Sequence, residues 1–414
     1  MKIIDLFSGG GGLSEGFRQI EGFDFICHVE KDKSACLTLQ LRNIFYYLKS
    51  NDSLDKYYDF LNGKISREEL FLQTPEKIIS DVLNLEINDE NVHKVYEYID
   101  ENLSDERLDG IIGGPPCQAY STIGRANNKH KKNTDNRIYL YEYYVEFLEK
   151  YNPKFFIFEN VKGLLSFKDY LNRPLLPIIM EAFESAGYEV QYKLVNAEDL
   201  GVSQKRERLF LVGFNKEEKI KIDFFEILEG YKSVAPNIRE LFLDLPSLHA
   251  GEGCNEYKEV ESSPVVREYY RRENFNILTQ HVARPNNKND LEIYRIVADS
   301  KRRGINLMYN ELPKELITHS NTNSFLDRYK ALNYDTVSHT VVAHIAKDGH
   351  YYIHPDINQN RSLSIREAAR IQGFPDDYFF ETSRTAAFLQ IGNAVPPILA
   401  KKLAQSIFKI FVEV

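Results

Sequence analysis

The first 30 residues contain the pattern that most constrains the fold of this chain. A strand-like run, KIIDLF at residues 2–7, leads into the glycines of residues 9–12, and a helical pattern and a second strand-like run, FDFICHVE at residues 23–30, follow. Strand, glycine turn, helix and strand in this order are typical of a βαβ unit, whose two strands lie parallel in one sheet. The N-terminal segment therefore predicts a parallel α/β sheet.

Strand-like and helical runs continue to alternate after this unit. The alternation predicts a doubly wound sheet with helices on both faces. Residues 43–78 contain little glycine and many tyrosines and leucines, so we expect inserted helices between the second and third strands. The further expected strands are residues 108–112, 155–158 and 209–213, and the expected helices are residues 138–150, 176–186 and 398–411.

Length and composition indicate two lobes. The chain has 414 residues, which exceeds the length of one average domain. Hydrophobic residues make up 43% and charged residues 27%, a composition that is ordinary for globular proteins. Because the alternation fades near residue 230, we expect a larger domain at 1–230, completed by 385–414, and a smaller domain at 231–384. The sequence has no run of 18 apolar residues and no signal-peptide pattern, so we expect a cytoplasmic protein without membrane segments.

The four cysteines, Cys27, Cys36, Cys117 and Cys254, show no C-x-x-C spacing. Four unpaired-looking cysteines in a chain of this length favour a reducing compartment, and we expect no disulfide framework and no metal site.

The charge distribution leaves room for a nucleic-acid partner. A net charge of -9 argues at first against one, since phosphates are bound by Lys and Arg. Residues 52–109 account for the excess, however, with 16 acidic and 6 basic residues. Residues 124–137 contain five basic residues against one acidic, and residues 265–304 contain nine against five. Most such runs are solvated surface, so their meaning depends on the motifs beside them.

The glycines of residues 9–12 point to a nucleoside site, although a glycine run alone is often a simple turn. Glycine lets the backbone approach a ligand closely, and Glu30 ends the next strand, where an acid can accept hydrogen bonds from both ribose hydroxyls. Leu13, Ser14 and Glu15 follow the glycines, so the spacing does not fit G-x-G-x-x-G. A cofactor without phosphates fits better, and we expect S-adenosylmethionine.

Cys117 lies in GGPPCQAYS, directly after the strand-like run LDGII. Open α/β sheets bind their ligands at the carboxyl ends of the strands, so we expect the thiol to face the cleft. Most lone cysteines are buried small hydrophobes, but the two prolines and the basic loop beside Cys117 argue against that role. A thiolate is a strong nucleophile once nearby positive charge lowers its pKa.

Two further motifs flank the expected strands. Glu159 in ENV follows the strand FFIF, where burial would raise the pKa of its carboxyl toward the range of a general acid. Arg206 and Arg208 in QKRER lie two apart on an extended segment, so we expect both to point the same way and to bind a phosphate or a carbonyl. The alternatives are a helix cap for Glu159 and a surface ion pair between Arg206 and Glu207.

In combination these motifs resemble the DNA cytosine-5 methyltransferases of the bacterial restriction-modification type. DLFSGGGG, Glu30, Asp81 in SDVLNL, GGPPCQAYS, ENV, QKRER, RSLSIREAARIQGFP and QIGNAVPP occur in the family's order over residues 5–397. The acidic stretch between Glu30 and Asp81 is longer than the family's usual spacing. We interpret RSLSIREAARIQGFP as an architectural helix, because its apolar residues recur at helical spacing.

The resemblance implies a Rossmann-like, S-adenosylmethionine-dependent methyltransferase domain at 1–230 with 385–414, and a target-recognition domain with a hinge at 231–384. Cys117 would be the nucleophile, Glu159 would contact the ring nitrogen and amino group of cytosine, and Arg208 its carbonyl oxygen, with Arg206 in support. The residues implied around S-adenosylmethionine are Phe7, Gly9, Gly11, Leu13, Glu30, Asp81, Pro116 and Asn393. The residues expected at the DNA are Gln118, Ser121, Arg125 and Arg137.

The implied reaction starts from the weak nucleophilicity of cytosine C5. Addition of the Cys117 thiolate to C6, with a proton from Glu159 at N3, makes C5 nucleophilic, and loss of the C5 proton later frees the thiol. The cytosine must first leave the duplex, and we expect residues 124–137 to close over it as a lid.

Three alternatives remain open. A tRNA cytosine-5 methyltransferase would share the scaffold, although the tRNA members have little between QKRER and the later motifs, where this chain has a long segment. A catalytically silent DNA-binding module is disfavoured by the intact Cys117, Glu159 and Arg208, and a nicotinamide-dependent oxidoreductase by the glycine pattern. The expected partners are double-stranded DNA and a cognate restriction endonuclease, and we expect a monomer.

Overall fold

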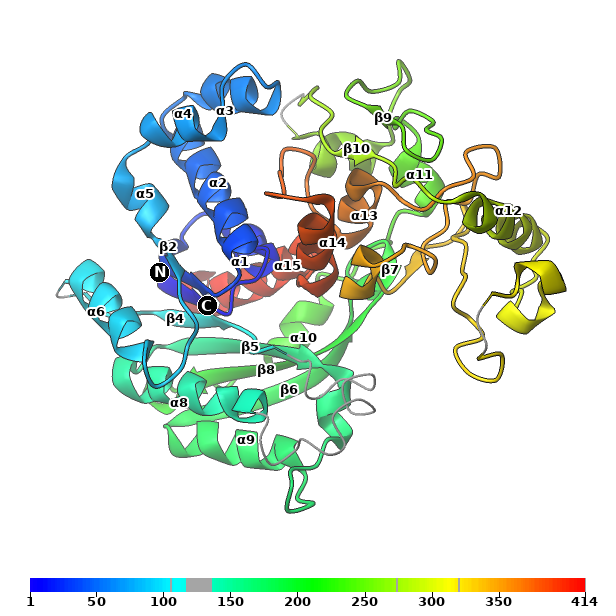
Figure 1. Cartoon of the computed structure of the whole chain (residues 1–414). Helices are drawn as coiled ribbons and strands as arrows, with labels where there is room; N and C mark the ends of the chain where they lie inside the picture. Colours follow the sequence, from blue (N-terminus) through cyan, green and yellow to red (C-terminus); the bar gives the residue numbers. More distant parts are fainter. Residues whose placement is uncertain (105, 117–135, 273–274, 319–320, 414) are drawn as a thin grey trace.

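The computed structural model describes residues 1–104, 106–116, 136–272, 275–318 and 321–413, and a seven-stranded sheet lies at its centre (Figure 1). The strand order is β3-β2-β1-β4-β5-β8-β6. The order reverses between β1 and β4, which is the point where open α/β sheets bind ligands. The strands are β1 (Lys2–Leu6), β2 (Asp24–Glu30), β3 (Val82–Asn84), β4 (Gly110–Gly113), β5 (Phe155–Val161), β6 (Tyr188–Asn196) and β8 (Glu207–Asn215).

The sheet is parallel from β3 to β5, as the sequence predicts, but β8 runs antiparallel to both of its neighbours. A short connection with the two-residue strand β7 (Gln204–Lys205) joins β6 to β8. Short connections suit antiparallel neighbours, whereas parallel strands need a longer crossover. The sequence pattern does not predict β6, because this edge strand is half exposed and carries no apolar run.

Helices cover both faces of the sheet. One face carries α1 (Gly12–Arg18), α10 (Phe224–Glu229) and α15 (Pro397–Phe408), and the other carries α6 (Val92–Leu103), α8 (Leu140–Tyr151) and α9 (Leu175–Ser185). Alternate strand residues feed the two cores, so Ile3 and Ile112 pack on the first face and Ile4 and Ile111 on the second. The doubly wound arrangement is therefore confirmed.

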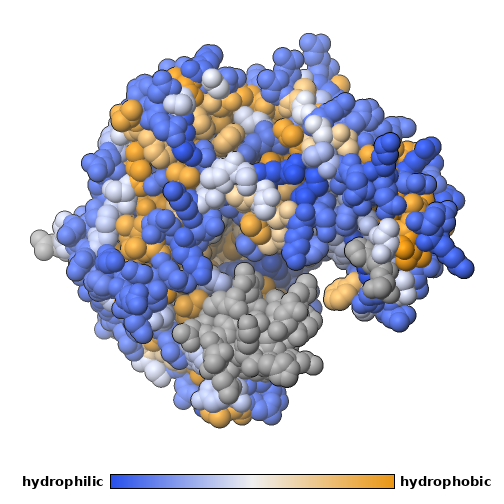
Figure 2. Space-filling view, viewed as in Figure 1, coloured by the Kyte–Doolittle hydropathy of each residue, from blue (hydrophilic) through white to orange (hydrophobic). Residues whose placement is uncertain are grey.

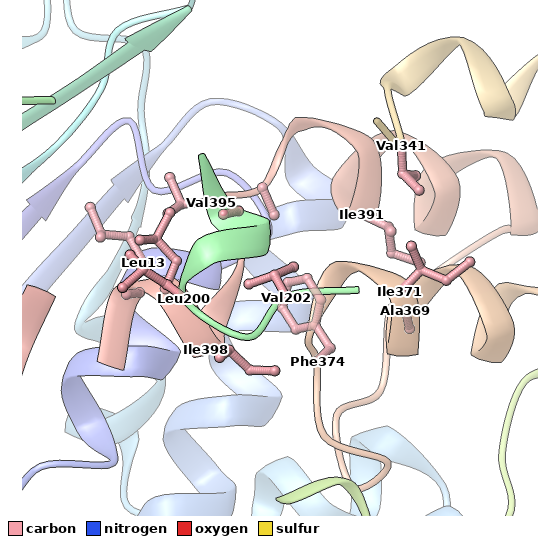
Figure 3. Close-up of a cluster of buried hydrophobic side chains, with 14 of the residues drawn as sticks. Leu13, Leu200, Val202, Val341, Ala369, Ile371, Phe374, Ile391, Val395 and Ile398 are labelled. Atoms are coloured by element: carbon pink, nitrogen blue, oxygen red, sulfur yellow. The ribbon is translucent and has the colours of Figure 1, made fainter. Parts of the chain in front are cut away.

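The C-terminal helix α15 packs back against α1, as the sequence predicts. A Cβ atom at Gly12 would lie 2.1 Å from the carbonyl oxygen of Val395, and one at Gly16 would lie 2.3 Å from the amide nitrogen of Lys401. Figure 3 shows Leu13 and Val395 beside Leu200 and Ile398 in the core that results.

The predicted insertion between β2 and β3 is helical. Its helices are α2 (Lys33–Ser50), α3 (Leu54–Leu61), α4 (Arg67–Leu72) and α5 (Glu76–Ser80). They enclose a small apolar core around Leu41, Phe45 and Tyr57. The hydroxyl of Tyr57 donates to the carbonyl of Asp377 at 3.0 Å, which joins the insertion to the later part of the chain.

Residues 231–384, here called the second lobe, include the buried helix α13 (Ile365–Gln372). All eight residues of α13 are buried, and Arg370 pairs with Asp244 at 2.6 Å and with Asp376 at 2.5 Å. Buried charges require such partners, and the predicted architectural role of this helix is confirmed. The boundaries at 230 and 384 remain predictions. The elements are α11 (Ile238–Phe242), β9 (Gly253–Cys254), β10 (His281–Val282), α12 (Lys288–Arg302), β11 (Ser338–His339), α13 (Ile365–Gln372) and, after the second lobe, α14 (Arg384–Asn393).

Across the described ranges, no helix combines the length and apolar character needed to cross a membrane.

Candidate active site at the carboxyl edge of the sheet

The turn after β1 is a tightly bonded segment. Phe7, Gly9 and Gly11 have φ angles of 58°, 54° and 75°, which lie in the left-handed region that residues with a Cβ atom disfavour. The amide of Ser8 donates to the carbonyl of Val29 at 3.1 Å, and the amide of Gly11 donates to the carbonyl of Ser8 at 3.0 Å. These bonds fix the shape of the turn before a ligand binds.

Gly9 is the glycine of this turn that leaves space for a ligand. A Cβ atom at Gly9 would meet no other atom within 4 Å. A Cβ atom at Gly10 would instead lie 2.9 Å from that of Gln390, and one at Gly11 would lie 2.6 Å from the hydroxyl of Tyr378. Packing therefore requires the later glycines, whereas Gly9 presents its backbone to an open space.

Glu30 lies beside this turn at the end of β2. Its Oε2 accepts a hydrogen bond from the amide of Gly9 at 2.8 Å, and its Oε1 accepts one from the amide of Asp32 at 2.8 Å. Burial raises the pKa of this carboxyl, although both amide bonds oppose the shift. Each oxygen keeps a further lone pair, so Glu30 can accept two more hydrogen bonds from a diol.

Asp81 does not join this group. The strand register places Glu30 opposite Asn84. Asp81 lies three residues before Asn84, so it is displaced from Glu30 by roughly 10 Å along the strand direction. The Asp81 carboxylate accepts from Lys77 Nζ and from the hydroxyl of Tyr98, both at 2.7 Å. Asn84 is the β3 residue that lies level with Glu30.

The other expected cofactor residues lie in different environments. Phe7 and Pro116 are half-buried near the ends of β1 and β4. The side chain of Leu13 is 5% exposed and belongs to the core between α1 and α15 (Figure 3). Asn393 is exposed at the end of α14. The structure therefore keeps the side chain of Leu13 out of any open site.

The turn after β4 brings three strand ends together. A Cβ atom at Gly113 would lie 2.0 Å from the carbonyl oxygen of Leu6, and one at Gly114 would lie 2.4 Å from the carbonyl oxygen of Glu159. These close approaches require glycine and place the GGPP turn over the end of β5. The described residues do not include Cys117, Gln118, Ser121, Arg125, the side chain of Arg137 or most of the expected lid at 124–137.

Glu159 and Arg208 form an ion pair between β5 and β8. Arg208 Nε lies 3.0 Å from Glu159 Oε1, and the two side chains are 13% and 15% exposed. Burial raises the pKa of Glu159, opposed by Arg208 and by Arg206, so the direction is the one expected from the sequence. A carboxyl with a raised pKa keeps its proton at higher pH than an ordinary glutamate.

Arg206 is fully buried and bonds to three backbone carbonyls. Its Nη1 donates to Val341 at 2.6 Å, and its Nη2 donates to Gly392 at 3.2 Å and to Ala394 at 2.9 Å. Arg206 therefore holds the backbone on both sides of Asn393 and ties it to the second lobe.

The structure does not place Arg206 and Arg208 on one ligand. β7 ends at Lys205 and β8 begins at Glu207, so the alternation expected of one continuous strand is interrupted at Arg206. The alternative is a surface ion pair between Arg206 and Glu207. The structure differs from it, because Glu207 pairs with Lys162 at 2.8 Å.

Gln204 and Tyr378 hold segments next to the site in place, although no pattern in the sequence assigns them a role. The side chain of Gln204 donates to the carbonyl of Ile371 at 3.1 Å and accepts from the amide of Val341 at 3.0 Å. The hydroxyl of Tyr378 donates to the carbonyl of Gly10 at 2.7 Å, which ties the glycine turn to the second lobe. Gln204 lies in the QKRER motif, but no local pattern could reveal that Tyr378 contacts Gly10, which is 368 residues away in the chain.

A buried ion network lies beside α1. Arg42 pairs with Glu15 at 2.7 Å and with Asp377 at 2.9 Å, and Arg272 pairs with each of these acids at 3.1 Å. Burial alone would raise the pKa of Glu15 and of Asp377, but the two arginines hold both below their ordinary values. The network joins α1, α2 and the second lobe.

The residues around Gly9 fit a nucleoside. The open backbone admits close approach, and Glu30 offers acceptors to a ribose diol. Within the described part of the chain, no cluster of three His, Cys, Asp or Glu side chains could hold a metal ion. The sheet order and this site define a Rossmann-like, S-adenosylmethionine-dependent methyltransferase fold.

Comparison with known proteins identifies the family. The model of the C-5 cytosine-specific DNA methylase family matches residues 1–61 and 70–409, so the chain belongs to this family and is a DNA cytosine-5 methyltransferase. It is 40% identical to the Type II methyltransferase M.Bpa9945I of Bacillus paralicheniformis, with 98% of each chain covered. It is 31% identical to the Type II methyltransferase M.DdeI of Desulfomicrobium norvegicum, with 98% of this chain and 88% of that protein covered.

Solved structures support the same fold. A putative DNA modification methyltransferase encoded within a prophage of E. coli aligns with a TM-score of 0.64 at 23% identity, with 99% of each chain covered. The S. pombe Dnmt2 methyltransferase aligns with a TM-score of 0.51 at 13% identity, with 99% of this chain and 98% of that chain covered.

Proposed function

We propose that this methyltransferase modifies C5 of a flipped-out cytosine in a specific duplex DNA sequence through a covalent bond between Cys117 and C6. The observation that carries the proposal is the Glu159–Arg208 pair, which lies under the GGPP turn that leads to Cys117. The buried acid and the arginine stand at the carboxyl edge that also carries Gly9 and Glu30.

The cofactor of the proposed reaction is S-adenosylmethionine, which supplies an electrophilic methyl group on a sulfonium. Gly9 would allow the close approach of the nucleoside, and Glu30 would accept hydrogen bonds from its ribose. Phe7, Gly11, Leu13, Pro116 and Asn393 complete the proposed surroundings. For Leu13 the contact would be a backbone one, because its side chain is in the core. Asp81 is the least supported member, since Lys77 and Tyr98 already bind its carboxylate.

The protein residues of the proposed site act on the cytosine ring. The Cys117 thiolate forms a bond to C6, the C5–C6 π electrons move to the C4–C5 bond, and the C4–N3 π electrons move to N3, where Glu159 supplies a proton or a hydrogen bond. Arg208 stabilises the charge that develops at O2. After methylation, a base removes the C5 proton, the electrons of the C5–H bond restore the C5–C6 double bond, and the S–C6 bond breaks to free the thiolate. Glu159 takes back the proton from N3. The raised pKa of Glu159 suits this proton-holding role.

The proposed substrate is double-stranded DNA, bound by the second lobe as the target-recognition domain. Flipping the base out of the stack costs a few kcal/mol, which DNA contacts must supply. Gln118, Ser121, Arg125 and Arg137 are proposed among those contacts, with residues 124–137 as the lid. The Type II names of the relatives support a restriction-modification system with a cognate endonuclease. We further propose that the enzyme acts as a cytoplasmic monomer.

The proposal is tested by incubating the protein with methyl-labelled S-adenosylmethionine and either duplex DNA or tRNA. We expect label on DNA, loss of labelling in Cys117→Ser, and full activity in the control Cys254→Ser, since the thiol of Cys254 donates to the carbonyl of Glu256 and is not among the proposed site residues. DNA that contains 5-fluorocytosine should become covalently attached to the wild-type protein.

Each other outcome identifies an alternative. Label on tRNA alone would favour the RNA methyltransferase, and absence of label from both substrates would favour the silent DNA-binding module. A Cys117→Ser variant that still methylates DNA would overturn the covalent mechanism.

A further inference from the structure

Phe325 is a large apolar side chain that the fold leaves in solvent. It is 72% exposed, although aromatic rings of this size are usually covered in a folded protein. Its φ angle is 54°, a left-handed conformation that a residue with a bulky side chain rarely adopts. An exposed ring on a disfavoured backbone is a frequent sign of a functional contact.

The turn that carries Phe325 is preformed. Arg328 Nε donates to the carbonyl of Phe325 at 3.0 Å, and Arg328 Nη2 donates to the carbonyls of Asn321 at 2.9 Å and Ser324 at 3.2 Å. The side chain of Asn321 accepts from the amides of Asn323 and Ser324, each at 3.1 Å. These bonds hold the segment from Asn321 to Arg328, here called the Phe325 turn, in one shape.

The Phe325 turn is also anchored to the core of the second lobe. The guanidinium of Arg328 lies 4.1 Å above the ring of Tyr309, and the amide of Tyr309 donates to the carbonyl of Leu326 at 2.7 Å. Tyr309 is buried and stacks on Tyr329 with ring centroids 5.9 Å apart. The ring of Phe325 is therefore presented by a rigid support, which lowers the entropy lost when it binds a partner.

The surroundings of the Phe325 turn favour a polyanionic partner. The C-terminal end of α12 carries three basic residues and one acid, which pairs with two of them. They are Lys301, Arg302 and Arg303, and Asp299. Burial lowers the pKa of Lys330, just after the turn; Asp327 within the turn opposes this shift, and Lys301 adds to it.

The location of the turn is compatible with the DNA that this enzyme modifies. The yellow segment after α12 lies at the lower right of the molecule in Figure 1. Figure 2 shows the surface hollowed between this lobe and the rest of the molecule.

We propose that the Phe325 turn is a base-contacting element of the second lobe, with the ring of Phe325 packed against a base of the recognition sequence. An aromatic ring can pack on a thymine methyl group in the major groove or enter between base pairs, and the exposed amide of Asn323 beside it can read a base edge. This inference rests on the proposed function, because it takes duplex DNA as the substrate.

The test measures methylation of an oligonucleotide duplex that contains the recognition sequence, identified by bisulfite sequencing of DNA from cells that express the protein. We expect Phe325→Ala to lower kcat/KM for DNA about tenfold or more, within the range of one lost base contact, and Phe325→Leu to lower it less. The affinity for S-adenosylmethionine and the thermal unfolding midpoint should stay unchanged.

Leu72→Ala is the matched control, because Leu72 is 87% exposed on α4, in the helical insertion. It should leave kcat/KM for DNA unchanged. A Phe325→Ala enzyme with wild-type kcat/KM and wild-type sequence preference would overturn the inference. A loss of self-association in that variant, at unchanged DNA kinetics, would overturn it too and assign the ring to contacts between copies of the chain. If the wild-type protein methylates no DNA, it is the proposed function that fails.

Discussion

At the scale of single residues, Glu159 and Arg206 show how neighbouring motifs acquire different roles. The side chain of Glu159 is 15% exposed and pairs with Arg208 at the edge of the sheet, whereas Arg206 is fully buried and enclosed by backbone carbonyls. In the proposed mechanism the first arrangement sets the pKa of the acid that meets N3, whereas the second fixes the position of the chain around Asn393. Arg206 is thus better described as a positioning residue than as a catalytic one.

Replacement of Glu159 by glutamine should lower kcat/KM for DNA by on the order of 10²–10⁴, because the amide cannot supply a proton at N3. The pKa of Glu159 is raised, so its protonated fraction is lost only as pH rises through that raised value. The wild-type pH profile of kcat/KM should contain this declining limb, and the variant should lack it. Glu207→Gln is the control, since Glu207 is exposed and pairs with Lys162. An unchanged profile in Glu159→Gln would contradict the assignment.

At the scale of elements, the glycine turn combines two separate requirements. Gly10, Gly11 and Gly12 are demanded by close packing against α14, Tyr378 and the residues before α15, whereas Gly9 faces open space. The sequence run predicts the turn, but it does not reveal which glycine serves the ligand. That distinction depends on what packs against each position.

Gly9→Ala should weaken binding of S-adenosylmethionine by about tenfold or more, since the added methyl group occupies the open space beside Glu30. The left-handed backbone adds a strain of about 1–2 kcal/mol. Gly63→Ala isolates the strain, because Gly63 also has a positive φ of 70° and open space around it, outside the site. Isothermal titration and urea unfolding of both variants should show equal destabilisation and weaker binding for Gly9→Ala alone. Equal affinities in the two variants would place the cofactor elsewhere.

At the scale of the whole molecule, buried polar contacts hold the second lobe against the first. Arg272 of the second lobe reaches Glu15 of α1, Tyr378 reaches Gly10, and Gln204 and Arg206 reach back to Val341. The second lobe is thus bonded to the glycine turn and to the QKRER segment.

Arg272→Ala should lower the free energy of unfolding by about 3–5 kcal/mol, because it leaves two buried carboxylates with Arg42 alone. The pKa values of Glu15 and Asp377 are lowered in the folded state, so their stabilisation is present above their ordinary values of 4.5 and 3.8 and is lost as pH falls through the folded values. Urea unfolding from pH 7 to pH 3 should therefore show a smaller acid loss in the variant.

Arg267→Ala is the control for this series, since Arg267 pairs with the exposed Glu261 and should change stability by less than about 1 kcal/mol. A variant at Arg272 that is as stable as this control would show that the network contributes little.

The sequence by itself determined the first βαβ unit, the doubly wound sheet, the inserted helices and the returning C-terminal helix, because each follows from local apolar periodicity and turn chemistry. It also determined the family, through motifs whose residues are close together in the chain. Only the tertiary structure decided the reversed direction of β8, the burial of Arg206 away from Arg208, the separation of Asp81 from Glu30 and the exposed ring of Phe325. These features depend on contacts between residues far apart in the chain, such as Tyr378 with Gly10, and on strand register, which shifts a side chain by several ångströms without leaving a local pattern.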